Sequence, residues 1–360
     1  MKIAVLAHIR HAIAEPFSGG MEAHCATLCR GLRAAGHQVT LFAAAGSQDE
    51  NLVEISDEPY EAVLPWNQYR GSPELADYQA RTFDRAKAKI LADGFDVVHN
   101  NSLHPAIIEW AARERIACVT SHHVPPFGAM AAAVKQVADI GHAQFTVTSH
   151  SQLSAWSELC RNNMRVVPNG IDCDAWISTD DISDYWTWAG RIVPNKGVAE
   201  AVTAARIAGA KLRIFGPIED ASYFSDRVEP LLIDGLEYHG HACAADLAPI
   251  LAKAKGALVT PMWDEPFGLV AAEALACGVP VVAFDRGAMR EVIGDCGIVV
   301  PAGDVGALAT AIDRVGAVNR KDCRARAIDS LSIPAMIRGY EACYTDAIRY
   351  AAADLVSEAA

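Results

Sequence analysis

The chain has 360 residues, of which 51% are hydrophobic, 21% charged and 7% aromatic. This length predicts about two domains, and such a chain can bury a large core without disulfide bonds or structural metals. The composition excludes disordered and fibrous proteins. With 31 basic and 44 acidic residues, the net charge of −13 argues against nucleic acid as a partner.

The charge and the histidines are unevenly distributed along the chain. Residues 1–168 carry 14 basic and 17 acidic side chains, a net charge of −3, which leaves −10 for residues 169–360. The first part also contains ten of the twelve histidines. The ten cysteines lie scattered in apolar stretches without a C-x-x-C pair, which is typical of reduced core residues in a cytoplasmic protein.

The beginning of the chain, M-K-I-A-V-L-A-H, turns polar too early for a signal peptide and is typical of a first strand. In the first half we expect strands at 2–7, 38–43, 95–99, 117–121, 144–148 and 164–167. Helix-length segments lie between most of them, at 21–35, 74–93, 104–115, 128–141 and 150–162. Near-continuous apolar strands alternating with helices predict a parallel sheet that is covered on both faces.

The same alternation repeats in the second half of the chain. We expect strands at 185–189, 211–215, 236–239, 256–260, 280–284 and 297–300, with helices between them. The break lies near 168–184, where P-N-G is followed by a polar, acidic stretch. We therefore predict two Rossmann-like α/β domains, at 1–168 and 169–339, and a C-terminal helix at about 340–360 that could pack back on the first. Ligands of such sheets bind at the carboxyl ends of the strands, and a cleft between two such domains is favoured.

The strongest local signal is the segment 265–273, which reads E-P-F-G-L-V-A-A-E between two expected strands. Glu265 falls in the strand-to-helix turn, Gly268 opens the helix, and Glu273 lies in its second turn. Free N–H groups at this helix N-terminus favour an anion. Glu273 is flanked by apolar residues, so burial would require a partner for its carboxylate.

Two other loops contain groups suited to phosphate. Arg191 and Lys196 flank a strand-to-helix loop in the more acidic half of the chain. The forked guanidinium of an arginine and the compact ammonium group of a lysine together suit a diphosphate. Gly19 and Gly20 end the long loop after the first strand, where backbone N–H groups can approach a phosphate closely. A surface ion pair and a plain loop-to-helix joint are the structural alternatives.

Four ordered motifs resemble the family-four retaining glycosyltransferases, which have the GT-B fold (glycosyl transferases group 1). They are G-G-M-E from residue 19, V-P-N-G-I-D from residue 167, G-R-I-V-P-N-K-G from residue 190, and the E-P-F-G-L-V-A-A-E segment. Together they span the whole chain. The resemblance implies transfer of a hexose-type sugar from a nucleotide diphosphate sugar, UDP- or GDP-linked, with retention at the anomeric carbon. In this family the leaving diphosphate is read as taking the acceptor proton in a front-face attack.

The resemblance also implies roles for individual residues. It assigns catalysis to His122, Arg191, Lys196 and Glu265, and donor binding to Gly19, Gly20, Gly240, His241, Phe267, Gly268, Leu269 and Glu273. Glu265 would hold sugar hydroxyls and Glu273 the ribose. The family often has His-Asp where this chain has His122 and His123, and a structural histidine at the strand end is the alternative. His99 and Asn101, at the end of strand 95–99, are acceptor-side candidates.

The remaining predictions concern metals, acceptors and rival functions. Asp172-Cys173-Asp174 spells the metal-binding D-x-D of another fold, but its place at the domain junction predicts a linker, so we expect no metal and no other cofactor. Lys135, Arg161 and Arg165 are too few for a basic membrane-binding face, which favours a small-molecule or glycan acceptor while leaving membrane association possible.

A nicotinamide-dependent oxidoreductase would need G-x-G-x-x-G directly after the first strand, and the chain lacks it. A sugar-nucleotide epimerase of the same fold and a non-catalytic sugar-nucleotide-binding protein remain alternatives.

Overall fold

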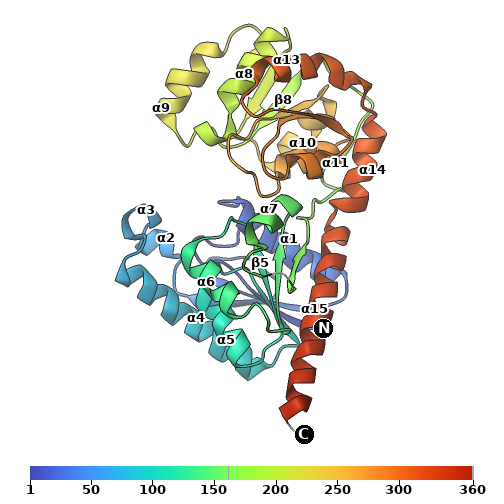
Figure 1. Ribbon diagram of the computed structural model, residues 1–360. Coiled ribbons are helices and arrows are strands. Elements are labelled where there is room, and N and C mark those ends of the chain that lie inside the picture. Colours follow the sequence, from blue (N-terminus) through green and yellow to red (C-terminus); the bar gives the residue numbers. More distant parts are fainter. Residues whose placement is uncertain (161, 359–360) are drawn as a thin grey trace. The chain divides into compact units, whose positions relative to one another are not determined.

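A computed structural model describes residues 1–160 and 162–358, with the backbone alone described for 354–358. The chain folds into two compact units (Figure 1). The first comprises Met1–Thr148, Gln152–Gly170 and the C-terminal segment from Met336; the second comprises Ser149–Ser151 and Ile171–Ala335. Residue 161, at the end of one predicted helix, and residues 359–360 of the predicted C-terminal helix lie outside the described residues.

The first unit contains a seven-stranded parallel sheet with the strand order β3-β2-β1-β4-β5-β6-β7. Its strands are β1 Lys2–Leu6, β2 Gln38–Ala44, β3 Leu52–Ser56, β4 Val97–Asn100, β5 Cys118–His122, β6 Ala143–Val147 and β7 Met164–Val166. Its helices are α1 Gly20–Ala34, α2 Tyr60–Val63, α3 Trp66–Tyr69, α4 Pro73–Asp93, α5 Pro105–Arg113 and α6 Gly128–Gln136, together with all but the first residues of α7 His150–Trp156 and α15 Ile333–Glu358.

Helices cover both faces of this sheet. On one face, strand residues such as Phe42 and Val98 pack with α4 and α5, and Phe145 packs with α6 and α7. The opposite face is covered by α1 and α15. Tyr340 of α15 contacts Ser121 of β5, and His24 of α1 lies 6.2 Å, ring to ring, from Tyr340. The order of the strands reverses between β1 and β4. The loops that follow these two neighbouring strands therefore start side by side at the carboxyl edge of the sheet.

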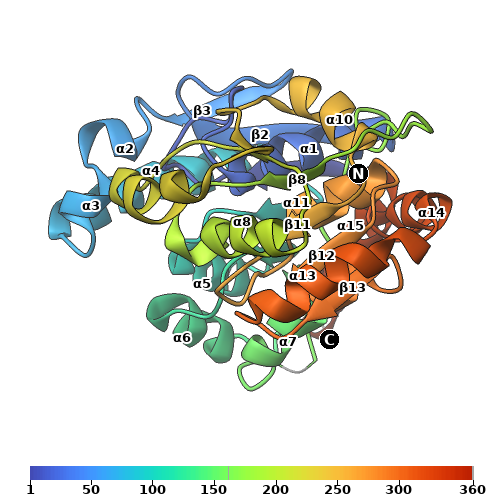
Figure 2. The same ribbon diagram turned by 90° about the horizontal axis from the view of Figure 1, so that it is seen from above.

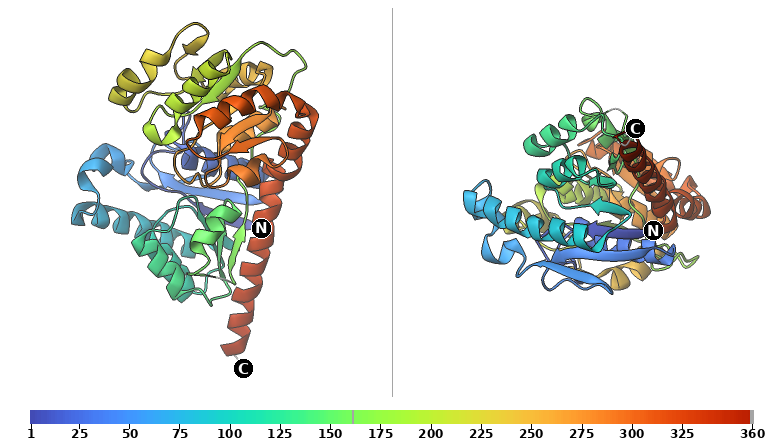
Figure 3. Two further views of the ribbon diagram at one scale, coloured as in Figure 1. Left: turned by 45° about the horizontal axis from the view of Figure 1, so that its top comes forward. Right: turned by 90° about the horizontal axis from the view of Figure 1, so that it is seen from below.

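The C-terminal helix α15 lies along the first unit (Figures 1 and 3). Buried polar contacts join it to the first sheet. The Tyr344 hydroxyl lies 2.6 Å from Nδ1 of His99, and Ser121 donates to the Tyr340 hydroxyl at 3.3 Å. Nε2 of His99 lies 3.0 Å from the Ser121 hydroxyl, so both ring nitrogens have a partner. The last helix in the sequence is therefore part of the first unit, which residues 1–168 alone would leave incomplete.

The second unit contains a six-stranded parallel sheet with the order β10-β9-β8-β11-β12-β13. Its strands are β8 Trp186–Ala189, β9 Leu212–Phe215, β10 Leu236–Tyr238, β11 Ala257–Val259, β12 Val281–Phe284 and β13 Gly297–Val300. Its helices are α8 Val198–Ile207, α9 Ala221–Tyr223, α10 Ala244–Lys253, α11 Leu269–Ala276, α12 Met289–Ile293, α13 Val305–Arg314 and α14 Arg320–Ser330, with helical turns η1 Pro194–Lys196, η2 Phe224–Val228, η3 Glu229–Leu231 and η4 Val315–Ala317.

Two helix layers enclose the second sheet. Trp186, Trp188 and Ile214 pack with α8 and α13 on one face (Figure 2), and Phe215 and Ala283 pack with α10, α11 and α12 on the other. The strand order reverses between β8 and β11, and the loops after these strands again meet at one place on the carboxyl edge.

The predicted doubly wound parallel architecture is confirmed, and every predicted strand is present with bounds that differ by at most two residues. β3 was not predicted, because this short edge strand contains Glu54 and lacks the continuous apolar character of the central strands. Helix α6 ends at Gln136 rather than 141. The Asn163 side chain donates to the carbonyl oxygens of Ala138 and Ile140, which lie beyond the helix end. Among the described residues, no helix is both long and apolar enough to cross a membrane.

Several histidines of the first unit, among them the buried His99 and His122 and the partly buried His8 and His123, are held in the uncharged form, which predicts acid sensitivity of the fold. Burial lowers the pKa to about 4 for His8 and His123 and to about 3 for His99 and His122. Below the unfolded value of about 6.5, the unfolded chain binds more protons than the native one, so stability falls as the pH falls. One such histidine costs about 2 kcal/mol between pH 7 and pH 5.

We therefore expect the free energy of unfolding, measured by urea titration, to decrease from pH 7 to pH 5. His122→Phe should reduce that decrease by about 2 kcal/mol, because it removes one of these protons. The exposed His241, replaced by Phe, is the matched control and should leave the pH dependence unchanged. Equal pH dependence in all three proteins would contradict the prediction.

Candidate functional site

Two loops that meet at the strand-order reversal of the second unit carry the central part of the candidate site. Residues 190–197 follow β8, and residues 260–268 follow β11. Backbone and side-chain bonds join the two loops. The Met262 amide donates to the Asn195 carbonyl at 2.9 Å, and the buried Thr260 hydroxyl contacts the carbonyl oxygens of Lys196 and Gly197 at 3.0 and 2.8 Å.

The contact between Gly197 and Thr260 requires glycine. Gly197 has φ +68°, and a Cβ atom built on it would lie 2.1 Å from the Thr260 carbonyl oxygen. Trp188, from the middle of the sheet, donates its indole N–H to the Thr260 hydroxyl at 2.9 Å. The position of Lys196 is therefore set by the adjacent strand. The sequence analysis did not identify Thr260, whose role depends on a contact across the sheet.

Lys196 and Glu265 form an ion pair at the carboxyl edge of this sheet. Nζ of Lys196 lies 2.6 Å from Oε2 of Glu265, and the two side chains are 22% and 16% exposed. The Trp263 indole donates to the same oxygen at 2.9 Å, and Nζ of Lys196 lies 5.3 Å from the centre of the Trp263 ring. These three side chains, which we name the Lys196 cluster, place a cation and a carboxylate side by side. Trp263 was not predicted from the sequence.

Glu265 is held by a close backbone contact as well. Its carbonyl oxygen accepts from the Ala288 amide at 2.9 Å. Gly287, with φ +57°, approaches so closely that a Cβ atom there would lie 2.2 Å from the Glu265 carbonyl oxygen. This turn fixes the Glu265 loop from the β12 side of the sheet.

The helix that follows Glu265 begins as the sequence predicts. Gly268 is the residue before α11, with φ +93°, Phe267 is buried, and Leu269 is the first helical residue. The first helical hydrogen bonds come from Ala271 and Ala272, and the amides before them have no acceptor among the described residues, so they are available to an anion.

Glu273 lies in the second turn of α11 and is only partly exposed. Burial raises the pKa of its carboxyl group to about 7. In the described part of the chain this carboxyl group has no ion-pair partner within 4 Å. It is thus a partly buried carboxyl whose protonation changes near neutral pH.

The other predicted residues of the second unit lie apart from the Lys196 cluster. Arg191 is exposed and pairs with Glu219 at 2.9 Å. Gly240, with φ +80°, follows the edge strand β10, and its carbonyl oxygen accepts from Gly216 at 2.9 Å; His241 is exposed. All of them lie at the carboxyl edge, but no contact joins them to Lys196 among the described residues.

In the first unit, Gly19 and Gly20 lie at the exposed N-terminus of α1. The first helical bond runs from the Ala23 amide to the Gly19 carbonyl, so earlier amides of this helix are free. His99 and Asn101 flank the end of β4, but they differ in role. His99 is fully buried and uses both nitrogens in the bonds to Ser121 and Tyr344, which favours a structural role over the acceptor-side role considered above.

His122 and His123 point into different surroundings. His122 is 1% exposed and stacks on Trp156 and Phe145, with ring centres 3.8 and 5.7 Å away. Within the described part of the chain, neither of its nitrogens has a hydrogen-bond partner. This burial favours the structural alternative for His122, because strand alternation directs its side chain under the helices.

His123 faces a polar group instead. Its Nε2 lies 3.2 Å from Oδ1 of Asn101, and its ring centre is 4.3 Å from that of His24. Asn101 Nδ2 and His24 Nε2 are buried, and no described residue is their hydrogen-bond partner. His24 and His123 were not predicted as site residues, because helix α1 and strands β4 and β5 bring them together only in the folded chain.

The D-x-D segment has a local role in the structure. Oδ1 of Asp172 accepts from the amides of Asp174 and Ala175 at 3.1 and 3.2 Å, which forms a turn at the start of the second unit. Among the side chains that the structure describes, those of residues 1–160 and 162–353, no group of three or more His, Cys, Asp or Glu is arranged to hold a metal ion.

The Gly197–Thr260 contact generates a prediction with an internal control. Gly197→Ala should destabilise the second unit by about 2–4 kcal/mol, because it adds a clash with backbone to the strain of a positive φ. Gly209 has φ +63° but no atom within 4 Å of a built Cβ, so Gly209→Ala should cost only about 1 kcal/mol. Thermal or urea unfolding compares the two variants, and equal losses would contradict the proposed contact.

Two family models match the chain, Glycosyltransferase Family 4 over residues 18–175 and Glycosyl transferases group 1 over residues 184–317. A phosphatidyl-myo-inositol mannosyltransferase of Mycobacterium leprae is 26% identical over 315 residues, 82% of this chain and 83% of that protein. The crystal structure of a glycosyltransferase involved in avilamycin A biosynthesis matches with TM-score 0.73 and 22% identity, over 97% of this chain and 98% of that one. Anabaena HepE in complex with UDP and glucose matches with TM-score 0.69 and 18% identity, over 96% and 99% of the two chains.

The structural likenesses extend over nearly the whole chain and agree with the two doubly wound parallel sheets. The two family models match most of the first unit and most of the second. The chain therefore belongs to glycosyltransferase family 4 and has the GT-B fold.

Proposed function

We propose that this glycosyltransferase moves a hexose-type sugar from a UDP- or GDP-sugar to a small or glycan acceptor, with retention at the anomeric carbon and without a metal. The observation that carries the proposal is the Lys196 cluster beside the free amides of α11. A cation and helix N-terminal amides suit a diphosphate, and a neighbouring carboxylate suits the hydroxyls of the attached sugar.

The chemical step places negative charge on the leaving diphosphate. Groups that stabilise this developing charge accelerate the reaction more than groups that bind the ground state equally well. Lys196 is positioned for this by Thr260 and by its ion pair. Arg191 carries the second cation of this loop, and its exposed pair with Glu219 costs little to exchange for a phosphate.

The two carboxylates of the site suit different parts of the donor. Glu265 is oriented by Trp263 and the Ala288 amide, and we assign it to sugar hydroxyls. Glu273 lies one turn into α11, and we assign it to the ribose, where hydroxyl donors favour its ionised form over the neutral form that burial favours. Gly240 and His241, after the edge strand, are assigned to the nucleotide base. The complex of HepE with UDP and glucose supports a nucleotide-sugar donor.

The acceptor side is assigned to the first unit. A hollow of about 400 Å³ in the loop after β1 is lined in part by His11, Glu15, Ser18 and Glu61. These acceptor and donor groups suit a polyhydroxylated compound. The inositol-containing substrate named for the mycobacterial mannosyltransferase is of that chemical kind, which supports a hydroxyl-rich acceptor.

Within the first unit, we assign to His123 the sugar-contacting role that the family resemblance gave to a histidine at this strand end. Its polar surroundings with Asn101 and His24 support this, whereas His122 is enclosed by aromatic rings. A neutral imidazole at this position can donate one hydrogen bond. Burial lowers the pKa of His123 to about 4, so it is neutral at physiological pH.

The central prediction concerns Lys196 and Glu265. Lys196→Ala and Glu265→Ala should each lower kcat for transfer by at least about 100-fold, because each removes a group aimed at the transferring sugar diphosphate. Release of nucleotide diphosphate from a panel of UDP-, GDP-, dTDP- and ADP-sugars, with and without candidate acceptors, measures this. Arg191→Ala should have a similar effect.

Lys255→Ala is the matched control, since Lys255 is an exposed lysine at the opposite edge of the same sheet, and it should transfer sugar normally. Normal turnover in the Lys196, Glu265 and Arg191 variants would reject the site. Recovery of a changed sugar still attached to its nucleotide would identify an epimerase instead.

A second pair of variants tests the histidine assignment. His123→Phe should lower transfer by about 10- to 100-fold with little change in fold, because it removes a polar contact to the sugar. His122→Phe keeps the stacked aromatic arrangement with Trp156 and should retain transfer activity. The opposite pattern, with loss only in the His122 variant, would restore the first assignment.

A further inference from the structure

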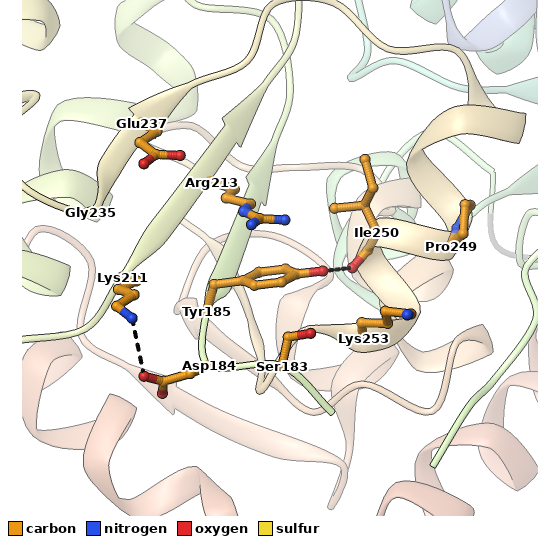
Figure 4. A pocket seen from close by; sticks show the side chains of 10 residues that line it. All are labelled: Ser183, Asp184, Tyr185, Lys211, Arg213, Gly235, Glu237, Pro249, Ile250 and Lys253. Atoms are coloured by element: carbon orange, nitrogen blue, oxygen red, sulfur yellow. Dashed lines mark hydrogen bonds and ion pairs between the residues drawn. The ribbon is translucent and has the colours of Figure 1, made fainter. Parts of the chain in front are cut away.

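A second hollow lies at the edge of the second sheet where the strands start. It has a volume of about 470 Å³ and is formed by residues just before or at the start of β8, β9 and β10 and by the last turns of α10 (Figure 4). The lining residues used below are Asp184, Tyr185, Lys211, Arg213, Glu237 and Lys253. The Lys196 cluster follows the ends of the strands, so this strand-start hollow is at the opposite edge of the same sheet.

Arg213 is held in place within this hollow. Its guanidinium carbon lies 3.9 Å from the centre of the Tyr185 ring, at stacking distance. The Tyr185 hydroxyl donates to the carbonyl oxygen of Ile250 in α10 at 2.8 Å, which fixes the ring under the guanidinium (Figure 4). A stacked arginine keeps its N–H groups in the plane, directed away from the ring.

The Arg213 guanidinium has no carboxylate within ion-pair distance in the described part of the chain. Glu237 is its neighbour in the register of β9 and β10, yet the two side chains form no ion pair. In contrast, Arg320, Arg324 and Arg326 of the same unit donate to backbone carbonyl oxygens. Arg213 therefore has N–H donors available for a ligand.

The rim of the hollow adds further positive charge. Lys211 pairs with Asp184 at 3.5 Å and Lys253 with Asp181 at 2.7 Å, and each of these lysines is about half exposed or more. Exposed pairs of this kind contribute little free energy, so both lysines can turn to an anion at small cost. Three basic and two acidic side chains line the hollow, which makes it net positive in the more acidic part of the chain.

We propose that the strand-start hollow binds a small phosphate monoester. The phosphate would accept two parallel hydrogen bonds from Arg213 and additional ones from Lys211 and Lys253, and the apolar part of the ligand would lie against Tyr185 and Ile250. The Arg213 guanidinium, with two lysines on the rim that can turn toward a ligand, favours a dianionic phosphate over a singly charged carboxylate. The volume is in the range of small-metabolite sites. This proposal is independent of the donor assignment, since the two sites share no residue.

Phenyl phosphate, titrated into the full chain and followed by calorimetry or ligand-observed NMR, tests the proposal. We expect binding in the micromolar to millimolar range and a loss of at least tenfold in Arg213→Gln, because the fork of N–H donors is removed. Arg206→Gln is the matched control: Arg206 is exposed on α8, on the other face of the sheet, and its variant should bind as the wild-type protein does.

Competition by a nucleotide diphosphate, the affinity for a carboxylate and a conservative variant of Arg213 test the proposal further. Saturating UDP or GDP should leave phenyl phosphate binding unchanged, because the donor site is elsewhere; competition would overturn the proposal. Benzoate should bind at least tenfold more weakly, and equal affinity would reject the preference for phosphate. Arg213→Lys preserves a cation and should weaken binding less than Arg213→Gln, with equal melting temperatures verifying the fold; wild-type affinity in both variants would also reject the site.

Discussion

The hydroxyl of Thr260 joins the two loops on which the candidate donor site depends. It contacts the carbonyl oxygens of Lys196 and Gly197 and accepts a hydrogen bond from the indole of Trp188 in β8. The loops after β8 and β11 are therefore joined to each other and to the sheet. Only glycine at position 197 allows the backbones to come this close. Lys196 thereby obtains a defined position while remaining partly exposed, which suits its proposed contact with a diphosphate.

The net charge of the second unit does not describe the charge at its individual sites. The half of the chain that begins at residue 169 has a net charge of −10, yet both of its proposed anion sites contain a fixed cation. Lys196 is paired with Glu265, and the proposed diphosphate would have to replace part of that pairing. Arg213 has no such carboxylate and is fixed by an aromatic ring. Net charge therefore predicts neither site. An anion is bound mainly by the charged groups within a few ångströms of it, because more distant charges are screened.

The first unit concentrates its polar groups on the face covered by α1 and α15. His99, Ser121, Tyr340 and Tyr344 form a buried network there, with His24, Asn101 and His123 nearby. His122, one residue earlier than His123, lies among aromatic rings on the other face. Alternation along a strand thus separates two adjacent histidines into a core residue and a candidate site residue.

The sequence by itself determined the parallel α/β class, the twelve central and outer strands with strong β-branched character, and the loops that carry Glu265, Gly268 and Lys196. These signals are local, since they depend on apolar periodicity and on the residues that begin a helix. Tertiary structure decided the rest. Trp263 and Thr260 acquire roles only because β8 and β11 are neighbours. Helix α15 packs on the first sheet although it lies at the far end of the sequence, and the pairing of His123 with Asn101 requires β4 beside β5. The physical reason is that strand order and side-chain direction follow from packing between segments distant in the chain, which no local pattern encodes.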